Sequence, residues 1–344
     1  MIQFQCDYNE GCHPEILAAL QRTNMEQTVG YGEDAYCAAA RDAVRRAIGR
    51  EDADVHFLVG GTQTNATVIA SILRPYQGVL SADRGHINVH ETGAIEHTGH
   101  KVLALPSCEG KITASQVEDA IKGHFAEDGP EHAVQPGMVY LSFPTELGTL
   151  YSKKELQDIS AVCRHYGLPL FIDGARMGYG LCSPDCDVTL EDIARLADVF
   201  YIGGTKVGAL FGEAVVIVSD ALKKDFRYYI KQHGAMLAKG RLLGLQFMTL
   251  FADGLYFRIS QHAIDMAMRI KNGLKETGIE LYSESGTNQQ FVVIEKDMYD
   301  RLSRDFLLSL WSETDDGRYV VRICTSWATT EENVNKLLNA FKKN

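Results

Sequence analysis

The most restrictive feature of this sequence is a regular alternation between short apolar runs of strand type and segments with helical spacing. The runs are rich in Val, Ile and Leu and are continuous rather than alternating, which is typical of parallel strands buried on both faces. Strands separated by helices favour an α/β fold. We therefore predict a mostly parallel sheet of the seven-stranded type, covered by helices, with strands at 54–61, 78–82, 101–105, 138–143, 168–173, 198–204 and 213–218.

The last two apolar runs differ from the others in their connection. The segment between 198–204 and 213–218 is too short for a helical crossover. Parallel neighbours need such a crossover, whereas antiparallel neighbours can be joined by a short loop. We therefore predict that these two strands pair antiparallel.

After residue 219 the alternation gives way to another pattern. A long helical region, 220–277, is followed by short strand-like runs, a helix at 297–311 and a last helix at 330–342. This pattern predicts a smaller α+β C-terminal domain. At 344 residues the chain also exceeds the length at which a single core keeps growing. We expect a large domain and a small domain that comprise, respectively, 25–250 and 1–24 plus 251–344.

Composition restricts the partners and the compartment. The net charge of −11 disfavours nucleic acid and anionic membranes as partners, and no apolar run approaches membrane-spanning length. The first residues lack the basic and apolar segments of an export signal. Eight scattered cysteines in such a chain indicate reduced thiols. We therefore expect a cytoplasmic globular protein that binds neither nucleic acid nor membranes.

Three motifs follow apolar runs, at the strand ends where open parallel sheets bind ligands. The first is Gly60-Gly61-Thr62, a glycine turn that opens a helix. Exposed N–H groups and the helix dipole would make this turn an anion site, with Thr62 adding a hydroxyl donor. Taken alone, glycine in such a turn also has a purely steric explanation.

The second motif is Asp173-Gly174-Ala175-Arg176, in which an acid ends an apolar run. Asp173 would face the cationic nitrogen of a heterocycle, and the guanidinium of Arg176 would bind a carboxylate or phosphate of the ligand. The alternative is structural, because Asp173 could cap the next helix or pair with Arg176. This motif by itself leaves both interpretations open.

The third motif places Lys206 among glycines at the end of another apolar run. Desolvating an ammonium group is costly, so a buried lysine is typical of Schiff-base chemistry, in which its pKa must fall. The structural alternative is a lysine whose ammonium group reaches solvent. Together, an anion-binding turn, an aspartate and a buried lysine are the parts of a pyridoxal-phosphate site.

These motifs resemble those of a known family. The chain is similar to the threonine aldolase and aromatic amino acid β-eliminating lyase family of pyridoxal-phosphate enzymes, which have the aspartate aminotransferase fold (fold type I). The resemblance covers nearly the whole chain and rests on "YGED" (31–34), "GGTQTN" (60–65), "RGHINVHETGA" (84–94), "DGAR" (173–176), "TKVGALFG" (205–212) and "VVRICTSWATTEE" (320–332).

The resemblance implies which residues hold the cofactor. Lys206 would carry pyridoxal 5′-phosphate covalently, and Asp173 would pair with its pyridine nitrogen. Gly61 and Thr62 would hold the phosphate, and His86 would stack on the cofactor ring.

The resemblance also implies how substrate binds. Arg322, together with Arg176, would clamp the α-carboxylate of an amino acid. Tyr31 resembles a tyrosine of the family's active site that a neighbouring subunit can contribute, and a homodimer or homotetramer is implied. Cys6 stands where the family has a serine expected to touch the carboxylate.

One departure from the family pattern concerns the chemistry itself. Glu146 stands where many threonine aldolases have a histidine that is one candidate for handling the substrate's β-hydroxyl group. We expect either His86 or Glu146 to take the β-hydroxyl proton. The substitutions at Cys6 and Glu146 leave cofactor binding intact and leave the substrate preference open.

The implied enzyme is a lyase: a pyridoxal-phosphate-dependent aldolase that cleaves a β-hydroxy-α-amino acid of the L-threonine or L-allo-threonine type to glycine and an aldehyde. The alternatives are β-elimination, transamination or racemisation with the same cofactor, or a non-catalytic protein that kept the fold. His86 and His90 are four residues apart, but no obvious ligand set completes a metal site, so we predict no metal.

Overall fold

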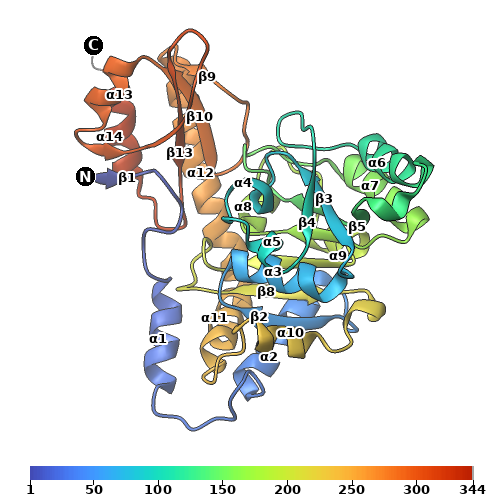
Figure 1. The fold of residues 1–344 in the computed structure, drawn as a ribbon. Coiled ribbons are helices and arrows are strands. Elements are labelled where there is room, and N and C mark those ends of the chain that lie inside the picture. Colours follow the sequence, from blue (N-terminus) through green and yellow to red (C-terminus); the bar gives the residue numbers. More distant parts are fainter. Residues whose placement is uncertain (343–344) are drawn as a thin grey trace.

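A seven-stranded sheet lies at the centre of the computed structural model, which describes residues 1–342 (Figure 1). Its strand order is β2-β8-β7-β6-β5-β3-β4. Neighbours from β7 to β4 pair parallel, whereas β8 runs antiparallel to both β2 and β7. The predicted mostly parallel α/β sheet and its antiparallel pair are confirmed. The strands are β2 (Asp54–Leu58), β3 (Gln77–Ala82), β4 (Lys101–Leu105), β5 (Gln135–Ser142), β6 (Leu170–Asp173), β7 (Val199–Gly203) and β8 (Glu213–Ile217).

Helices cover both faces of this sheet because residues along each strand alternate between two apolar cores. In β7, Phe200 and Ile202 contribute to one core, whereas Val199 and Tyr201 contribute to the other. The first core is covered by α2 (Ala35–Ile48), α6 (Ala114–Ala126), α7 (Lys153–Tyr166), α9 (Leu190–Leu196) and α11 (Arg241–Phe251). The second is covered by α3 (Gly61–Ile72), α4 (His86–Val89), α5 (Ala94–His97) and α10 (Phe226–Gln232).

The ends of the helices follow from local sequence, with one informative exception. The Ser152 side chain accepts the N–H of Glu155 at the start of α7, and the Glu155 side chain accepts the N–H of Ser152 in return. The helix ends at Gly167, whose φ of 68° suits glycine. By contrast, α3 begins after Gly60, which supplies no capping side chain. The first N–H groups of α3 are therefore free to bind an anion.

A second sheet, antiparallel and of order β12-β13-β10-β9, forms a smaller lobe. The N-terminal strand joins this lobe, because β1 pairs parallel with β11, with Ile2 opposite Phe306. Figure 1 shows β1 and the last described helix, α14, together in this lobe. The predicted smaller α+β unit is confirmed. Its elements are β1 (Ile2–Gln3), β9 (Glu280–Leu281), β10 (Gln289–Ile294), α13 (Lys296–Leu302), β11 (Phe306–Leu307), β12 (Ser309–Glu313), β13 (Tyr319–Cys324) and α14 (Glu331–Lys342).

The helix predicted at 297–311 was wrong in its second half. The helix α13 ends at Leu302, and Ser309–Glu313 forms the edge strand β12. All five residues of β12 are exposed or half-buried, so no buried face imposes an alternating apolar pattern on its sequence. Pairing with β13, which no local pattern reveals, decides its conformation.

Two helices connect the lobes. The helix α12 (Leu255–Glu276) contributes Leu255 to the core of the larger lobe and Leu274 to the core of the smaller one. The helix α1 (Pro14–Thr23) packs against α11 and places Ile16 in the larger core, although β1 lies in the smaller lobe. The division at residues 24 and 250 stays a prediction.

Two further properties concern the helices and the cysteines. None of the helices in residues 1–342 has both the length and the apolar character needed to cross a membrane. All eight cysteines are free thiols. The cytoplasmic location stays a prediction.

Candidate active site

A cavity of about 270 Å³ opens at the carboxyl ends of β5, β6 and β7, beside the first turn of α3. Its lining includes the predicted cofactor and catalytic residues Gly61, Thr62, His86, Glu146, Asp173, Arg176 and Lys206. A second, larger hollow of about 610 Å³ adjoins it, shares His86, Glu146, Arg176 and Lys206, and extends to Arg322 of the smaller lobe. The structure therefore brings together residues that are far apart in sequence.

Two glycines allow the loops that carry Asp173 and Lys206 to approach each other. A Cβ atom at Gly203 would lie 2.3 Å from the carbonyl oxygen of Ala175, and one at Gly174 would lie 2.0 Å from the carbonyl oxygen of Tyr201. Both distances are shorter than real Cβ contacts, so side chains there would force the two loops apart. The glycines of both motifs thus have a steric function.

Asp173 ends β6 as a fully buried carboxylate with four hydrogen-bond donors. Tyr140 and Asn65 donate to Oδ2 at 2.5 and 3.0 Å, while Tyr201 and the N–H of Ala175 donate to Oδ1. Burial favours the neutral acid, but the charge of His86 and the tyrosine hydroxyls hold the pKa of Asp173 below its usual value. The group is therefore an anion at neutral pH.

Lys206 reaches the same cavity from the loop after β7. Burial and the nearby positive charge of Arg176 lower the pKa of its ammonium group. The hydroxyl of Tyr179 donates to the backbone carbonyl of Lys206 at 2.6 Å and fixes the loop. A lysine with a lowered pKa has a larger fraction of free amine, the form that attacks a carbonyl group. The side chain is half-buried and lines both hollows, so the role of Lys206 stays a prediction.

His86 is oriented by a carboxylate beneath it. Its Nδ1 lies 2.7 Å from Oε1 of Glu91, and the same oxygen accepts a hydrogen bond from Asn65 Nδ2 at 2.7 Å. Because Asn65 also donates to Asp173, one amide joins the histidine pair to the floor of the cavity. The contact with Glu91 fixes the ring orientation and places a proton on Nδ1.

Glu146 lies in the loop after β5, on the wall shared by the two hollows. Its Oε1 accepts the hydroxyl of Ser142 at 2.6 Å and the N–H of His86 at 2.9 Å. Its Oε2 is buried and has no hydrogen-bond partner among residues 1–342. Burial raises the pKa of this carboxyl group.

The two arginines sit at the mouth of the cavity in different states. Asp7 accepts hydrogen bonds from Nε and Nη2 of Arg176 at 2.6 and 3.0 Å, so the alternative pairing of Asp173 with Arg176 is not formed. Although burial disfavours ionisation, Arg176 holds the pKa of Asp7 below its usual value. Arg322 donates to the carbonyl of Gln5 at 3.0 Å, and its Nε is buried without a partner among residues 1–342.

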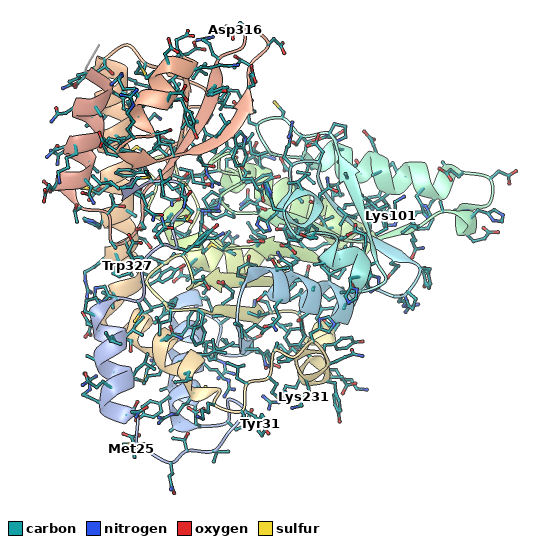
Figure 2. All side chains as sticks on the ribbon, turned by 60° about the vertical axis from the view of Figure 1, so that its left-hand side comes forward. Met25, Tyr31, Lys101, Lys231, Asp316 and Trp327 are labelled. Atoms are coloured by element: carbon teal, nitrogen blue, oxygen red, sulfur yellow. The ribbon has the colours of Figure 1, made fainter. Side chains whose placement is uncertain are left out.

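The other two predicted substrate residues lie less directly at the site. The thiol of Cys6 donates to Asn9 Oδ1 at 3.0 Å, and its neighbour Tyr8 lines the cavity. Tyr31 is half exposed on the connection between α1 and α2, where Lys231 Nζ lies 5.2 Å from the centre of its ring. Figure 2 shows Tyr31 and Lys231 together at the lower end of the molecule. Within one chain Tyr31 borders a different, small hollow.

Comparisons with known proteins agree with this geometry. The sequence model of the beta-eliminating lyase family matches residues 3–297. The chain belongs to the beta-eliminating lyase family. Among members of similar sequence, the low specificity L-threonine aldolases of Pseudomonas sp. (strain NCIMB 10558) and Pseudomonas aeruginosa are each 30% identical, over 97% of this chain and 95% of those proteins. The resemblance inferred from the motifs is confirmed.

Solved structures place this beta-eliminating lyase family member within a known fold. The threonine aldolase of Leishmania major is 47% identical, with a TM-score of 0.96 over 99% of both chains. An aspartate aminotransferase of Thermus thermophilus, only 14% identical, superposes with a TM-score of 0.74 over 99% of this chain and 91% of the other. The predicted aspartate aminotransferase fold, fold type I, is confirmed.

The site of this beta-eliminating lyase family member also contains residues that sequence patterns did not reveal. Tyr140 and Tyr201 lie in apolar strands, where aromatic residues are usually core. Asn65 lies four residues after Gly61, one helical turn along α3, and Glu91 lies in the histidine-rich segment. A polar residue one turn after an anion-binding glycine was the one available signal.

Proposed function

We propose that this chain is a pyridoxal-phosphate-dependent aldolase, a lyase that cleaves a β-hydroxy-α-amino acid of the L-threonine or L-allo-threonine type to glycine and an aldehyde. The observation that carries the proposal is one cavity in which an anionic Asp173, a lysine of lowered pKa and the uncapped start of α3 meet. The threonine aldolases of Pseudomonas and Leishmania major, similar over nearly the whole chain, support the choice of substrate.

The cavity residues fit pyridoxal phosphate by charge and by chemistry. Asp173 would keep a proton on the ring nitrogen, because a nearby anion favours the cationic form. Lys206 would hold the carbonyl carbon covalently. The free N–H groups of Gly61 and Thr62 would bind the phosphate, and His86, oriented by Glu91, would lie against the ring. When bound, the cofactor accepts the electron pair that the breaking Cα–Cβ bond releases.

The mouth of the cavity would fix the amino acid by its α-carboxylate. Asp7 engages Nε and Nη2 of Arg176, which orients the guanidinium and leaves Nη1 for a ligand. Arg322 would supply its buried, unpartnered Nε from the opposite lobe. Two guanidinium groups on one carboxylate would set the rotation of the substrate, and with it the Cα bond that breaks.

Glu146 is the better candidate for the base. Its Oε2 is buried and unpartnered among residues 1–342, whereas the ring of His86, held by Glu91, would lie against the cofactor. A carboxylate oxygen without a partner on the cavity wall would take the proton of the β-hydroxyl group as the bond breaks. Burial raises the pKa of Glu146, which makes it a stronger base once ionised.

The products formed from a panel of amino acids test this function. Purified protein with added cofactor would be incubated with L-threonine, L-allo-threonine, phenylserine and L-serine. We expect glycine and acetaldehyde in equal amounts from at least one threonine isomer. Pyruvate from serine or 2-oxobutyrate from threonine would favour β-elimination, and an amino-group transfer or loss of optical activity would favour transamination or racemisation. Bound cofactor without turnover would favour a non-catalytic binding protein.

We also propose that the chain forms a homodimer or homotetramer. Met25 and Val29 are 88% and 67% exposed, and half-exposed Tyr31 lies on the same connection between α1 and α2. A second copy covering these residues would bury them and bring Tyr31 towards another active site. Light scattering on the purified protein should give a multiple of the 38.1 kDa chain mass, and a monomer would contradict the proposal.

A further inference from the structure

Glu213 is a buried carboxyl group that the proposed mechanism does not use. It opens β8 and is 3% exposed, although the rest of that strand is apolar. An ionised carboxylate in an apolar sheet is strongly unfavourable unless it is paired or hydrogen-bonded. Its presence therefore needs an explanation beyond the packing of the strand.

The position of Glu213 in the sheet brings it to the cofactor cavity. In the two antiparallel ladders it lies opposite Leu58 of β2 and Gly203 of β7. Leu58 leads into the anion-binding turn at Gly61, and Gly203 leads into the loop that carries Lys206. Glu213 lines the cavity together with these two motifs. It therefore lies between the proposed phosphate site and the reactive lysine.

The surroundings of Glu213 favour its neutral form. Its Oε2 accepts the N–H of Gly204 at 3.0 Å, and a hydrogen bond from the side chain of Thr205 also favours the ionised form, but burial outweighs both. Burial raises the pKa of Glu213 to about 8, against the attraction of Lys206. The same burial lowers the pKa of Lys206, so both groups tend towards their uncharged forms. The titratable groups that face Glu213 are Lys206, Asp173, Tyr201 and Tyr256.

We propose that Glu213 carries a proton in the cofactor-bound protein, and that only this neutral side chain admits a dianionic phosphate group beside it. A carboxylate at this position would repel the phosphate in a cavity where charges are weakly screened. The protonated acid has no net charge and can donate a hydrogen bond to a phosphate oxygen. The inference rests on the proposed pyridoxal-phosphate cofactor. It adds the requirement that Glu213 be protonated when the phosphate group binds.

The proton requirement predicts how affinity depends on pH. Below the Glu213 pKa of about 8 the group is already protonated, so its titration leaves phosphate binding unchanged. Well above the pKa, the protonated fraction of Glu213 falls tenfold with each pH unit, so the Kd for the phosphate rises about tenfold per unit. Because only the upper half of the interval from pH 7 to pH 9 lies above the pKa, the Kd rises about tenfold over the whole interval. A phosphate monoester has a second pKa of about 6 and stays dianionic over this range.

Ligands without an aldehyde separate phosphate binding from covalent attachment to Lys206. Binding of pyridoxine 5′-phosphate and of pyridoxine to the full-length protein freed of cofactor would be followed by fluorescence at pH 7, 8 and 9. Because the ring titrates alike in both ligands, the ratio of their Kd values reports only the contribution of the phosphate group. In the wild type we expect the Kd ratio of the phosphate ester to pyridoxine to rise about tenfold from pH 7 to pH 9. In Glu213→Gln we expect a constant ratio.

Asp198→Asn is the matched control. Asp198 is a second carboxyl group whose pKa is raised by burial, but it precedes β7 at the far end of the sheet, where it accepts the N–H of Leu170 at 2.9 Å. We expect this variant to keep the wild-type pH dependence. Loss of that dependence in Asp198→Asn as well would overturn the specific assignment to Glu213.

The outcomes distinguish this inference from the proposed function. The same pH dependence in wild type and Glu213→Gln would overturn the inference. If the variant does not fold, the wild type decides alone, because equal pH dependence for the phosphate ester and for pyridoxine would overturn it too. Failure to bind pyridoxal phosphate at any pH would instead overturn the proposed function. Covalent binding to Lys206 with a flat phosphate profile would reject only the role of Glu213.

Discussion

The floor of the cavity, around Asp173 and Lys206, and its mouth, around Glu146 and Arg322, differ in how completely their polar atoms are hydrogen-bonded. At the floor, both oxygens of Asp173 accept hydrogen bonds from Tyr140, Tyr201 and their neighbours. At the mouth, Glu146 Oε2 and Arg322 Nε are buried without partners among residues 1–342. Buried polar groups are normally satisfied, so an unpartnered one that lines the cavity is available to a ligand, and at the floor only Asn65 Oδ1 and Glu91 Oε2, behind Asp173 and His86, share this state. Asp173 is thus already oriented for the cofactor, whereas Glu146 and Arg322 each keep a polar atom that the substrate could bind.

The largest expected effect is at the floor, in Lys206→Ala. The variant should lose all detectable turnover and the visible absorbance of the lysine-bound cofactor, because no other group would hold the cofactor covalently. Lys154→Ala, on the exposed face of α7 where Lys154 pairs with Asp158, should behave as the parent. Absorbance spectra and product assays on both variants measure this. An unchanged spectrum in Lys206→Ala would remove that residue from its role.

Glu146→Gln tests the mouth. Loss of a general base should lower kcat by about 10³-fold while the spectrum of the bound cofactor stays that of the parent. Only ionised Glu146 can take a proton, so the parent's kcat/KM should rise with pH through a pKa above the usual value of about 4.3. The variant should lack this acidic limb.

The matched control for Glu146→Gln is Glu118→Gln, which removes a surface pair with Lys122. It should keep both the rate and the acidic limb of the parent. If Glu146→Gln kept the limb instead, another group, His86 first, would be the base.

Asp173→Asn returns to the floor. The change preserves the size of the side chain but removes the negative charge, so we expect kcat to fall about 10²- to 10³-fold, the usual scale for a preorganised electrostatic group. In contrast to Glu146→Gln, the cofactor spectrum should also change, because the ring nitrogen would lose its anionic partner. A parent-like kcat would refute the proposed contact.

The smallest effect is expected for Arg322→Lys. Lysine keeps the charge but not the planar pair of donors, so KM should rise about tenfold with little change in kcat or in the cofactor spectrum. The exposed Arg269→Lys, which alters a surface pair with Glu331, should leave KM unchanged. A fall in kcat at constant KM in Arg322→Lys would place that arginine in the chemical step rather than in carboxylate binding.

Local sequence was sufficient to predict the main sheet and the loops of the site. Continuous apolar runs marked the seven strands, and the rule that ligands bind at carboxyl ends placed Gly61, Asp173 and Lys206 together. Each of these residues also breaks its local pattern, as a glycine at a helix start, an acid after a strand, or a lysine among glycines. Such local conflicts are expected at functional sites.

The partners of these residues depend on strand order, which no local pattern encodes. Asp173 is flanked by Tyr140 and Tyr201 because β6 lies between β5 and β7. Glu213 reaches the cavity only because β8 pairs with both β2 and β7. The same limit explains the error over 297–311, where pairing with β13 decides the conformation of an edge strand. Tertiary neighbours thus decide what single residues leave open.

In the proposed site, one pyridoxal-phosphate ring would lie between Asp173 and Lys206. The most direct test is to reduce the cofactor-loaded protein with borohydride, digest it and locate the added phosphopyridoxyl mass by peptide sequencing. We predict that this mass lies on Lys206 and that it is absent from the same peptide in Lys206→Ala. Attachment to a different lysine, or no attachment at all, would contradict it.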